Sequence, residues 1–157
     1  MAVNLSAPQF RHAAVLVKEV RNSLRESDLA AAWLELEIAE SLLMNSTEQV
    51  LTTLRARKGM GLTIAIDDIG AGFSSLAWLW RFPFDTLKID RAFTQGLERD
   101  ARVDVILQSI VSLAHALGMR VNAEDVETGA QRQAPQKHGC DEWQGCLPVQ
   151  CLMLCGT

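Results

Sequence analysis

Two adjacent aspartates, Asp67 and Asp68, directly follow an apolar, strand-like run, and a glycine-rich turn comes after them. Carboxylate oxygens are the ligands that hard divalent cations such as Mg²⁺ and Mn²⁺ prefer. Because side chains alternate across a strand, the two carboxylates would point in different directions and could serve two metal ions. Gly70 and Gly72 would let the backbone approach a ligand closely. The pair indicates a metal site, while an ordinary acidic turn explains it equally well when the pair is taken alone.

Polar residues end hydrophobic runs at several places along the chain, and amphipathic segments separate these places. The residues are Asn4, Glu37, Asp67, Lys88, Glu124 and Gln144. An alternation of strand and helix is typical of parallel strands joined by right-handed crossovers. In a βα barrel the C-terminal ends of the strands gather at the ligand site. We therefore predict an α/β fold of the TIM-barrel type, mostly parallel, in which these side chains surround one site.

Helices of the expected kind can be placed between the strands. Apolar residues at steps of three and four predict amphipathic helices over residues 10–24 and 103–117. Gly118 would end the second of these helices. His12 and His115 lie off the apolar stripes, so we interpret them as surface residues rather than metal ligands.

Composition narrows the class of partner. The chain has 157 residues, 48% of them hydrophobic, and a formal net charge of −4. The absence of a basic patch argues against a nucleic-acid polymer as partner. No apolar run reaches the roughly 18 residues of a membrane span, and no signal peptide is visible, so we predict a cytoplasmic protein. The cysteines are Cys140, Cys146, Cys151 and Cys155. Their spacing matches no common zinc pattern, and we interpret them as reduced thiols.

Short motifs along the chain are similar, in order and spacing, to those of the EAL domain family. They are NLS at 4–6, EIAES at 37–41, DDIGAGFSS at 67–75, LKID at 87–90, AEDVET at 123–128 and CDEWQG at 140–145. The resemblance covers about residues 2 to 146. It implies a TIM-barrel-like phosphodiesterase that uses two Mg²⁺ or Mn²⁺ ions to linearise cyclic di-GMP, a bacterial second messenger.

The resemblance assigns metal ligands to this chain. It makes Asn4, Glu37 and Asp67 ligands of one ion, and Asp67 bridges to a second ion that Asp68 also binds. Glu124 matches an acidic residue of the family's site that is either a metal ligand or the general base.

The same resemblance implies roles around the attacking water. Lys88 would position the water, and Gln144 would help to hold it. A lysine at a strand end is alternatively just a solvated charge.

Glu40 would anchor the loop after Asp68, a loop implicated in metal binding and in formation of a homodimer. The motifs do not indicate which residues bind the substrate. The motifs also contain Asp90, Glu127 and Asp141, which are either site residues or ordinary loop carboxylates.

The chain also departs from the family's pattern. The Glu-Ala-Leu segment that names the family, and whose glutamate is a metal ligand, does not precede Asn4. We expect residues 1–146 to form a partial EAL domain with about six of eight strands, and residues 147–157 to be a divergent tail. Without the motif glutamate, we expect weaker metal binding and an inactive fragment when the chain is isolated.

Substitutions near the predicted site point the same way. Asn122 shares a strand face with Glu124, so its side chain is expected to point into the barrel, where an unpaired amide would cost about 1–3 kcal/mol. Asp125 occupies the family's glycine position and adds a negative charge beside Glu124. The leading hypothesis is an EAL-type cyclic di-GMP phosphodiesterase domain. The alternatives are a non-catalytic module that binds cyclic di-GMP or a protein partner, and a decayed gene product that does not fold stably.

Overall fold

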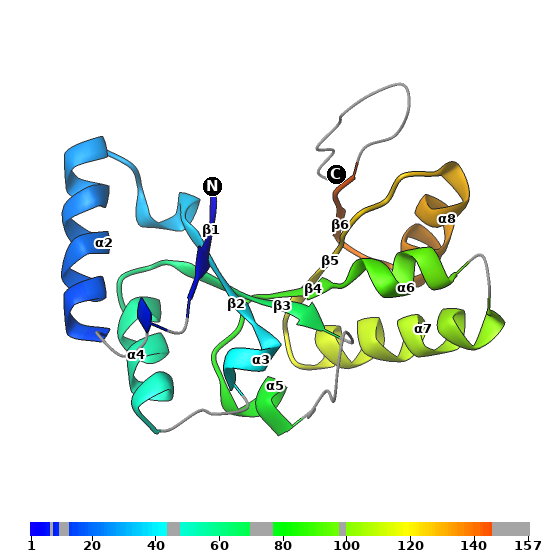
Figure 1. Cartoon of the computed structure of the whole chain (residues 1–157), viewed down its shortest axis with the longest axis horizontal. Coiled ribbons are helices and arrows are strands. Elements are labelled where there is room, and N and C mark those ends of the chain that lie inside the picture. The colour runs from blue at the N-terminus through cyan, green and yellow to red at the C-terminus, as the bar shows by residue number, and fades with distance from the viewer. Residues whose placement is uncertain (7, 10–12, 44–47, 70–76, 98–99, 146–157) are drawn as a thin grey trace. The chain divides into compact units, whose positions relative to one another are not determined.

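The computed structural model describes residues 1–6, 8–9, 13–43, 48–69, 77–97 and 100–145 (Figure 1). Its strands are β1 (Ala2–Leu5), β2 (Glu35–Ala39), β3 (Thr63–Ile69), β4 (Thr86–Ile89), β5 (Arg120–Ala123) and β6 (Glu142–Trp143). The helices are α2 (Ala13–Ser27), the 3₁₀ helix η1 (Ala31–Trp33), α3 (Glu40–Leu43), α4 (Glu48–Lys58), α5 (Ala77–Arg81), α6 (Arg91–Gly96), α7 (Ala101–Ala116) and α8 (Gly129–His138). Strands and helices alternate as the sequence predicts.

The order of the strands in the sheet follows their order in the chain, from β1 to β6. The pairs β1–β2, β4–β5 and β5–β6 are parallel. This topology is typical of repeated βα units, in which a helix returns the chain to the start of the next strand. The predicted α/β class with parallel strands is therefore confirmed.

The chain divides into two compact units. The first holds β1, β2, the body of β3 as far as Ile66, and helices α2 to α5. The second holds the end of β3 from Asp67, strands β4 to β6, and helices α6 to α8. Each unit is described separately below.

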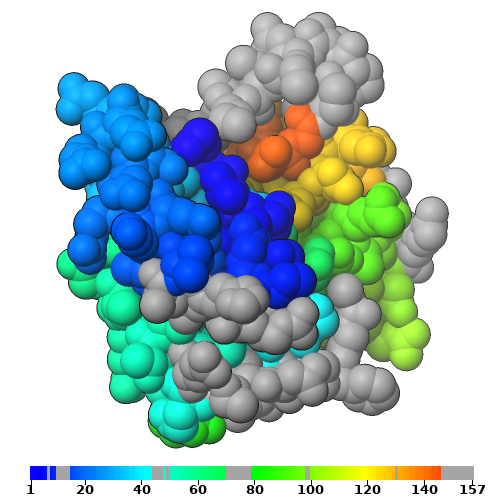
Figure 2. Space-filling model, turned by 60° about the vertical axis from the view of Figure 1, so that its left-hand side comes forward, coloured from blue at the N-terminus to red at the C-terminus, as the bar shows by residue number. Residues whose placement is uncertain are grey.

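The core of the first unit forms where β2 and β3 meet the helices. The buried residues include Leu36 and Ile38 of β2, Ile64 and Ile66 of β3, Leu43 of α3 and Leu54 of α4. Asp85 holds the start of β3: its carboxylate accepts a hydrogen bond from the Ile64 backbone N–H at 2.9 Å and pairs with Lys58. β1 lies at the surface of this unit (Figure 2), and its first three side chains are exposed.

The core of the second unit lies between its strands and α7. Its buried residues include Leu87 and Ile89 of β4, Val121 and Ala123 of β5, and Leu107, Val111 and Ala114 of α7. Two helices begin at aspartates that accept backbone hydrogen bonds: Asp90 caps α6 and Asp100 caps α7. α8 begins at a capping box formed by Thr128 and Gln131, and Pro135 lies within this helix.

The predicted helices are present with small shifts. α2 covers most of the helix expected over residues 10–24, although Phe10 and His12 lie outside the described residues. α7 matches the second predicted helix, and Gly118, with φ of 76°, follows its end. His115 is exposed, as predicted. Within the described part of the chain, no helix is long and apolar enough to cross a membrane.

Candidate active site

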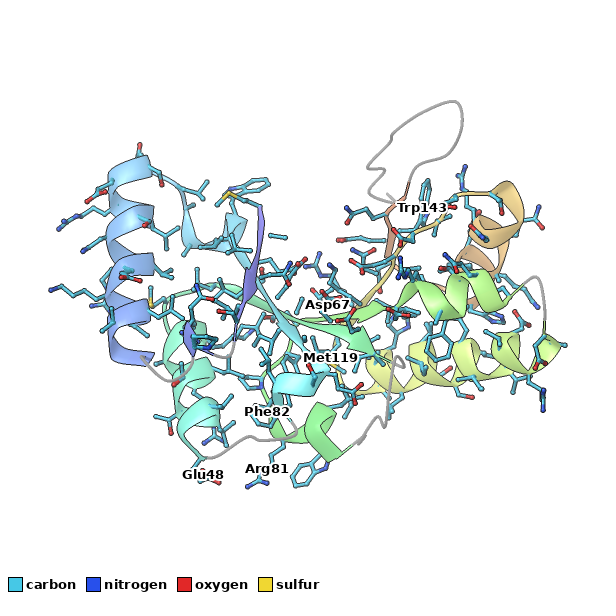
Figure 3. The ribbon with its side chains drawn as sticks, viewed as in Figure 1. Glu48, Asp67, Arg81, Phe82, Met119 and Trp143 are labelled. Carbon is cyan, nitrogen blue, oxygen red and sulfur yellow. The ribbon has the colours of Figure 1, made fainter. Side chains whose placement is uncertain are left out.

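Three of the predicted site residues come together in the second unit around Lys88. Its ammonium Nζ lies 3.9 Å from Oδ1 of Asp67 and forms an ion pair with Oε1 of Glu124. Asp67 stands at the C-terminal part of β3 (Figure 3). The Lys88 side chain is only 6% exposed. Because water rarely reaches this ammonium, the alternative interpretation of Lys88 as a solvated surface charge is wrong.

The strand pattern explains why Lys88 is buried. All four residues of β4 are buried, and alternation places Lys88 on the face opposite to that of Leu87 and Ile89. In the parallel register, Lys88 lies beside Asn122 of β5. Glu124 comes directly after β5, and its backbone N–H donates to the Ile89 carbonyl at 3.2 Å. A lysine buried in this way needs carboxylate partners, since desolvating an unpaired ammonium costs several kcal/mol.

The backbone of Gln144 forms hydrogen bonds with residues on both sides of Glu124. The Gln144 N–H donates to the Ala123 carbonyl at 2.8 Å, and the Gln144 carbonyl accepts from the Val126 N–H at 3.0 Å. Just before Gln144, the ring of Trp143 (Figure 3) packs under the guanidinium of Arg132 from α8, with 4.5 Å between the guanidinium carbon and the ring centroid. The end of β6 is therefore fixed both to β5 and to α8.

Asp68 differs from Asp67 as the predicted alternation requires. Its side chain is exposed, whereas that of Asp67 is half-buried. Its backbone has φ of 59°, and its N–H donates to Oδ1 of Asp67 at 2.9 Å. Asp and Asn tolerate this left-handed conformation better than most residues. The chain thus turns at Asp68, and the two carboxylates point in different directions.

The two substitutions noted near Glu124 have visible structural consequences. The side-chain oxygen Oδ1 of Asn122 is buried and has no hydrogen-bond partner among the described residues. Asp125 has φ of 50°, the left-handed conformation that favours glycine. A glycine at this position would adopt the same conformation without strain.

The remaining predicted ligands belong to the first unit. Asn4 and Glu37 are register partners in the parallel pair β1–β2, so their side chains share one face of these strands. Asn4 is exposed, while Glu37 is buried. Glu40 is buried at the start of α3. The loop that Glu40 is predicted to anchor, residues 70–76, lies outside the described residues, so this role stays a prediction.

The carboxylates of the second unit suit a hard cation. Asp67, Asp68 and Glu124 offer oxygen atoms only, the donor type that Mg²⁺ and Mn²⁺ take. Asp67 and Glu124 already flank a positive group, the Lys88 ammonium. In the described ranges, no group of three or more His, Cys, Asp or Glu side chains is gathered as a metal site. The metal-ligand assignments therefore stay predictions that the donor chemistry favours.

The less specific carboxylates turn out to have structural partners. Asp90 is the N-cap of α6, accepting from the Ala92 N–H at 2.7 Å. Asp141 accepts from the Val121 N–H at 2.8 Å and contacts the His115 ring at 2.9 Å. Both are explained as ordinary structural carboxylates.

Cys140 and Thr94 are two further polar residues of the second unit. Burial raises the pKa of the Cys140 thiol to about 12, so this cysteine is protonated at neutral pH, and the other cysteines lie outside the described residues. Sequence reasoning missed Thr94, whose hydroxyl contacts the Glu124 carbonyl at 3.0 Å. No motif or spacing gives a signal for this contact, because it joins residues that are distant in the chain.

The chain is similar to known proteins in sequence and in fold. The EAL domain family matches residues 1–148. The chain is 44% identical over 147 residues to the bifunctional diguanylate cyclase/cyclic di-GMP phosphodiesterase MucR of Pseudomonas aeruginosa, covering 94% of this chain and 21% of MucR. It is 40% identical to the cyclic di-GMP phosphodiesterase NbdA of the same organism, covering 94% of this chain and 19% of NbdA. The chain thus spans about a fifth of the length of these relatives.

Solved structures agree with this match. The phosphodiesterase of PaMucR in complex with c-di-GMP superposes with a TM-score of 0.86 at 43% identity, covering 95% of this chain and 60% of that one. A manganese/cy-diGMP complex of Klebsiella pneumoniae BlrP1 gives a TM-score of 0.86 at 30% identity, covering 92% and 37%. These likenesses confirm the predicted partial βα-barrel fold. Because the family model matches residues 1–148 of the 157-residue chain, the chain belongs to the EAL domain family.

Proposed function

We propose that this chain is part of the catalytic domain of a metal-dependent phosphodiesterase that hydrolyses cyclic di-GMP to the linear dinucleotide. The observation that carries the proposal is the buried Lys88 ammonium between the carboxylates of Asp67 and Glu124, at the ends of neighbouring strands. Relatives named as phosphodiesterases for this nucleotide are 44% and 40% identical to the chain over 147 residues, and the solved PaMucR phosphodiesterase has the same fold. The division into residues 1–146 and a tail from residue 147 remains part of the proposal.

Mg²⁺ or Mn²⁺ is the proposed cofactor, since BlrP1 binds cy-diGMP in complexes with manganese and with calcium. The residues that would hold the ions are Asn4, Glu37, Asp67, Asp68 and Glu124. When bound, such ions acidify a water molecule and stabilise the charge that develops on the phosphoryl oxygens. The oxygen-only donor set agrees with this choice of cation.

The protein's own groups then have distinct tasks. Lys88, held between two carboxylates, presents a fixed positive charge that can donate hydrogen bonds to the attacking water and to phosphoryl oxygens. Glu124 can accept the proton that the water loses as its oxygen bonds to phosphorus. The bond from phosphorus to the leaving ribose oxygen then breaks, and this oxygen takes up a proton to become a hydroxyl, so that one water molecule has been added across the bond. The Gln144 side chain, on the segment bonded to Ala123 and Val126, would orient the water.

Two finer points belong to the same proposal. A cytoplasmic location is proposed because the proposed substrate is a bacterial second messenger. A homodimer through the loop after Asp68 follows from the family resemblance, and sedimentation of the purified chain would test it. The competing function is binding of cyclic di-GMP without hydrolysis, and the assay below separates the two.

The test compares lysines in two ion pairs. Lys88→Met removes the buried ammonium of the second unit, and the matched control Lys58→Met removes the lysine paired with Asp85 in the first unit. Both are made in the chain itself and in a chimera in which residues 1–145 replace the matching region of MucR. Formation of the linear dinucleotide is followed chromatographically with Mn²⁺ or Mg²⁺ present.

Hydrolysis by the chimera is expected, with kcat falling roughly 100-fold or more in Lys88→Met, the scale for losing one electrostatic stabiliser. Lys58→Met should stay within about twofold of the parent, because exposed ion pairs contribute little. Binding of cyclic di-GMP by a chimera that forms no linear product would establish the non-catalytic alternative. Full activity in Lys88→Met would remove Lys88 from the mechanism.

A further inference from the structure

Thr94 is a fully buried polar residue on α6 whose hydroxyl reaches outside its own helix. Its Oγ1 lies 2.9 Å from the Arg91 carbonyl and 3.0 Å from the Glu124 carbonyl. Carbonyl oxygens only accept, so the single hydroxyl proton is shared between the two. The contact with Arg91 is the usual one of a helical threonine with its preceding turn. The contact with Glu124 is not local, because the two residues are 30 positions apart.

The position of α6 relates this contact to Lys88. The helix begins directly after β4, the strand that carries Lys88, and Asp90 caps its first turn. Thr94 therefore connects the element that follows Lys88 to the segment that carries Glu124. The side chains of Lys88 and Glu124 form an ion pair, so the same two segments meet twice.

The backbone around Glu124 needs such support. The Glu124 N–H donates to the Ile89 carbonyl at 3.2 Å, and two residues later the Val126 N–H donates to the Gln144 carbonyl at 3.0 Å. Between these bonds the chain turns sharply at Asp125, with φ of 50°. The Glu124 carbonyl belongs to the peptide that enters this turn. A hydroxyl bound to that carbonyl fixes the orientation of the peptide.

We propose that Thr94 is a positioning residue for Glu124: its hydroxyl holds the Glu124 peptide so that the carboxylate meets Lys88. The proposal rests on the proposed function insofar as Glu124 takes part in hydrolysis. The hydrogen bond between the Thr94 hydroxyl and the Glu124 carbonyl is present in the second unit whether or not the protein is catalytically active. Loss of this hydrogen bond should therefore change the geometry of the Lys88–Glu124 ion pair in the protein without substrate.

The experiment uses the full 157-residue chain and three variants. Thr94→Val has nearly the same shape and lacks the hydroxyl, while Thr94→Ser keeps the hydroxyl. Thr53→Val is the control, because Thr53 is also a buried helical threonine but lies on α4 of the first unit. Amide hydrogen exchange is measured over residues 123–127. The ¹⁵Nζ signal of Lys88, assigned by its loss in Lys88→Met, reports whether the ammonium is held in its ion pair.

In Thr94→Val we expect exchange to rise at least tenfold at Glu124 and Val126, whose N–H groups donate to Ile89 and Gln144, and the Lys88 ammonium signal to broaden beyond detection. Thr94→Ser should restore both readouts to near the parent's values, and Thr53→Val should leave both unchanged. Parent-like exchange and a sharp Lys88 signal in Thr94→Val would overturn the proposal. So would an equal rise in exchange throughout α7, which would mean that the residue only stabilises the fold.

Failure of the proposed function would look different. A chimera with no hydrolysis of cyclic di-GMP would refute the catalytic assignment, while the exchange and ammonium measurements would still decide whether Thr94 orients Glu124.

Discussion

Gly145 is the position where a single added methyl group should do the most local damage. A Cβ atom built there would lie 2.0 Å from the carbonyl oxygen of Val126, 2.4 Å from its nitrogen and 2.6 Å from its carbonyl carbon. All three are backbone atoms, so they cannot rotate away as a flexible side chain would. To reach an ordinary van der Waals separation, the end of β6 would have to move by about 1.5 Å.

The structure indicates what that movement would cost. The Val126 N–H bond to the Gln144 carbonyl, at 3.0 Å, would break, and the Gln144 N–H bond to Ala123, at 2.8 Å, would lengthen. A backbone hydrogen bond contributes about 1 kcal/mol net, and a donor left buried without a partner costs about 1–3 kcal/mol. We therefore expect Gly145→Ala to lower the free energy of unfolding by about 2–4 kcal/mol.

Urea unfolding followed by tryptophan fluorescence measures this change, and Gly129→Ala is the matched control. Gly129 is the first residue of α8, and a Cβ there would meet no atom within 4 Å. Replacing a helical glycine by alanine in open space should be neutral or stabilise by up to about 1 kcal/mol. A Gly145→Ala variant with the stability of Gly129→Ala would refute the reasoning, since it would mean that the end of β6 does not lie against Val126.

Two further predictions concern polar groups of the second unit. Asn122→Leu, which has nearly the same shape, should raise the free energy of unfolding by about 1–2 kcal/mol because it removes the buried, unpartnered Oδ1, and a lower value in urea unfolding would contradict this. Asp104 accepts a 2.7 Å hydrogen bond from His138, and this bond, with a smaller effect of Lys137, lowers the pKa of the Asp104 carboxyl below its ordinary 3.8. A carboxyl whose pKa is lower in the folded state stabilises the protein at pH values above its ordinary pKa. This stabilisation is lost as the pH falls through the folded-state pKa. The difference in unfolding free energy between the parent and Asp104→Asn should therefore be complete above pH 3.8 and should shrink as the pH falls from 3.8 through the lower folded-state pKa. A difference that persists below the folded-state pKa would be evidence against the charge of Asp104 as its cause.

The elements of the fold follow from local patterns in the sequence. The apolar run ending at Asp67 and Asp68 forms β3, and the run around Lys88 forms β4, because hydrophobic residues bounded by polar ones are typical of buried strands. The capping box of α8, Thr128 with Gln131, is likewise a local T-x-x-Q pattern. Such features depend on residues a few positions apart, so one sequence is enough to find them.

The partners within the site depend on register between distant segments. Composition cannot tell that Lys88 is buried between two carboxylates, because this follows from the alignment of β4 with β5 and from the end of β3. Asp90 is a residue whose task the motif alone leaves open. It lies in the LKID motif beside Lys88, yet its carboxylate caps α6. Motifs identify the segments of the site, while hydrogen bonds decide which of their residues have structural tasks.

The turn after Glu124 shows how these distant contacts act together. A residue other than glycine in the left-handed conformation costs of order 1 kcal/mol and persists only where the surrounding structure determines the backbone more than once. Here three elements contribute: β4 through the Ile89 carbonyl, α6 through the Thr94 hydroxyl, and the end of β6 through the Gln144 carbonyl. Together they impose the φ of 50° that Asp125 adopts. The strained turn is therefore a consequence of holding Glu124 in place, and the same bonds that fix the carboxylate against Lys88 allow aspartate to stand where glycine would be unstrained.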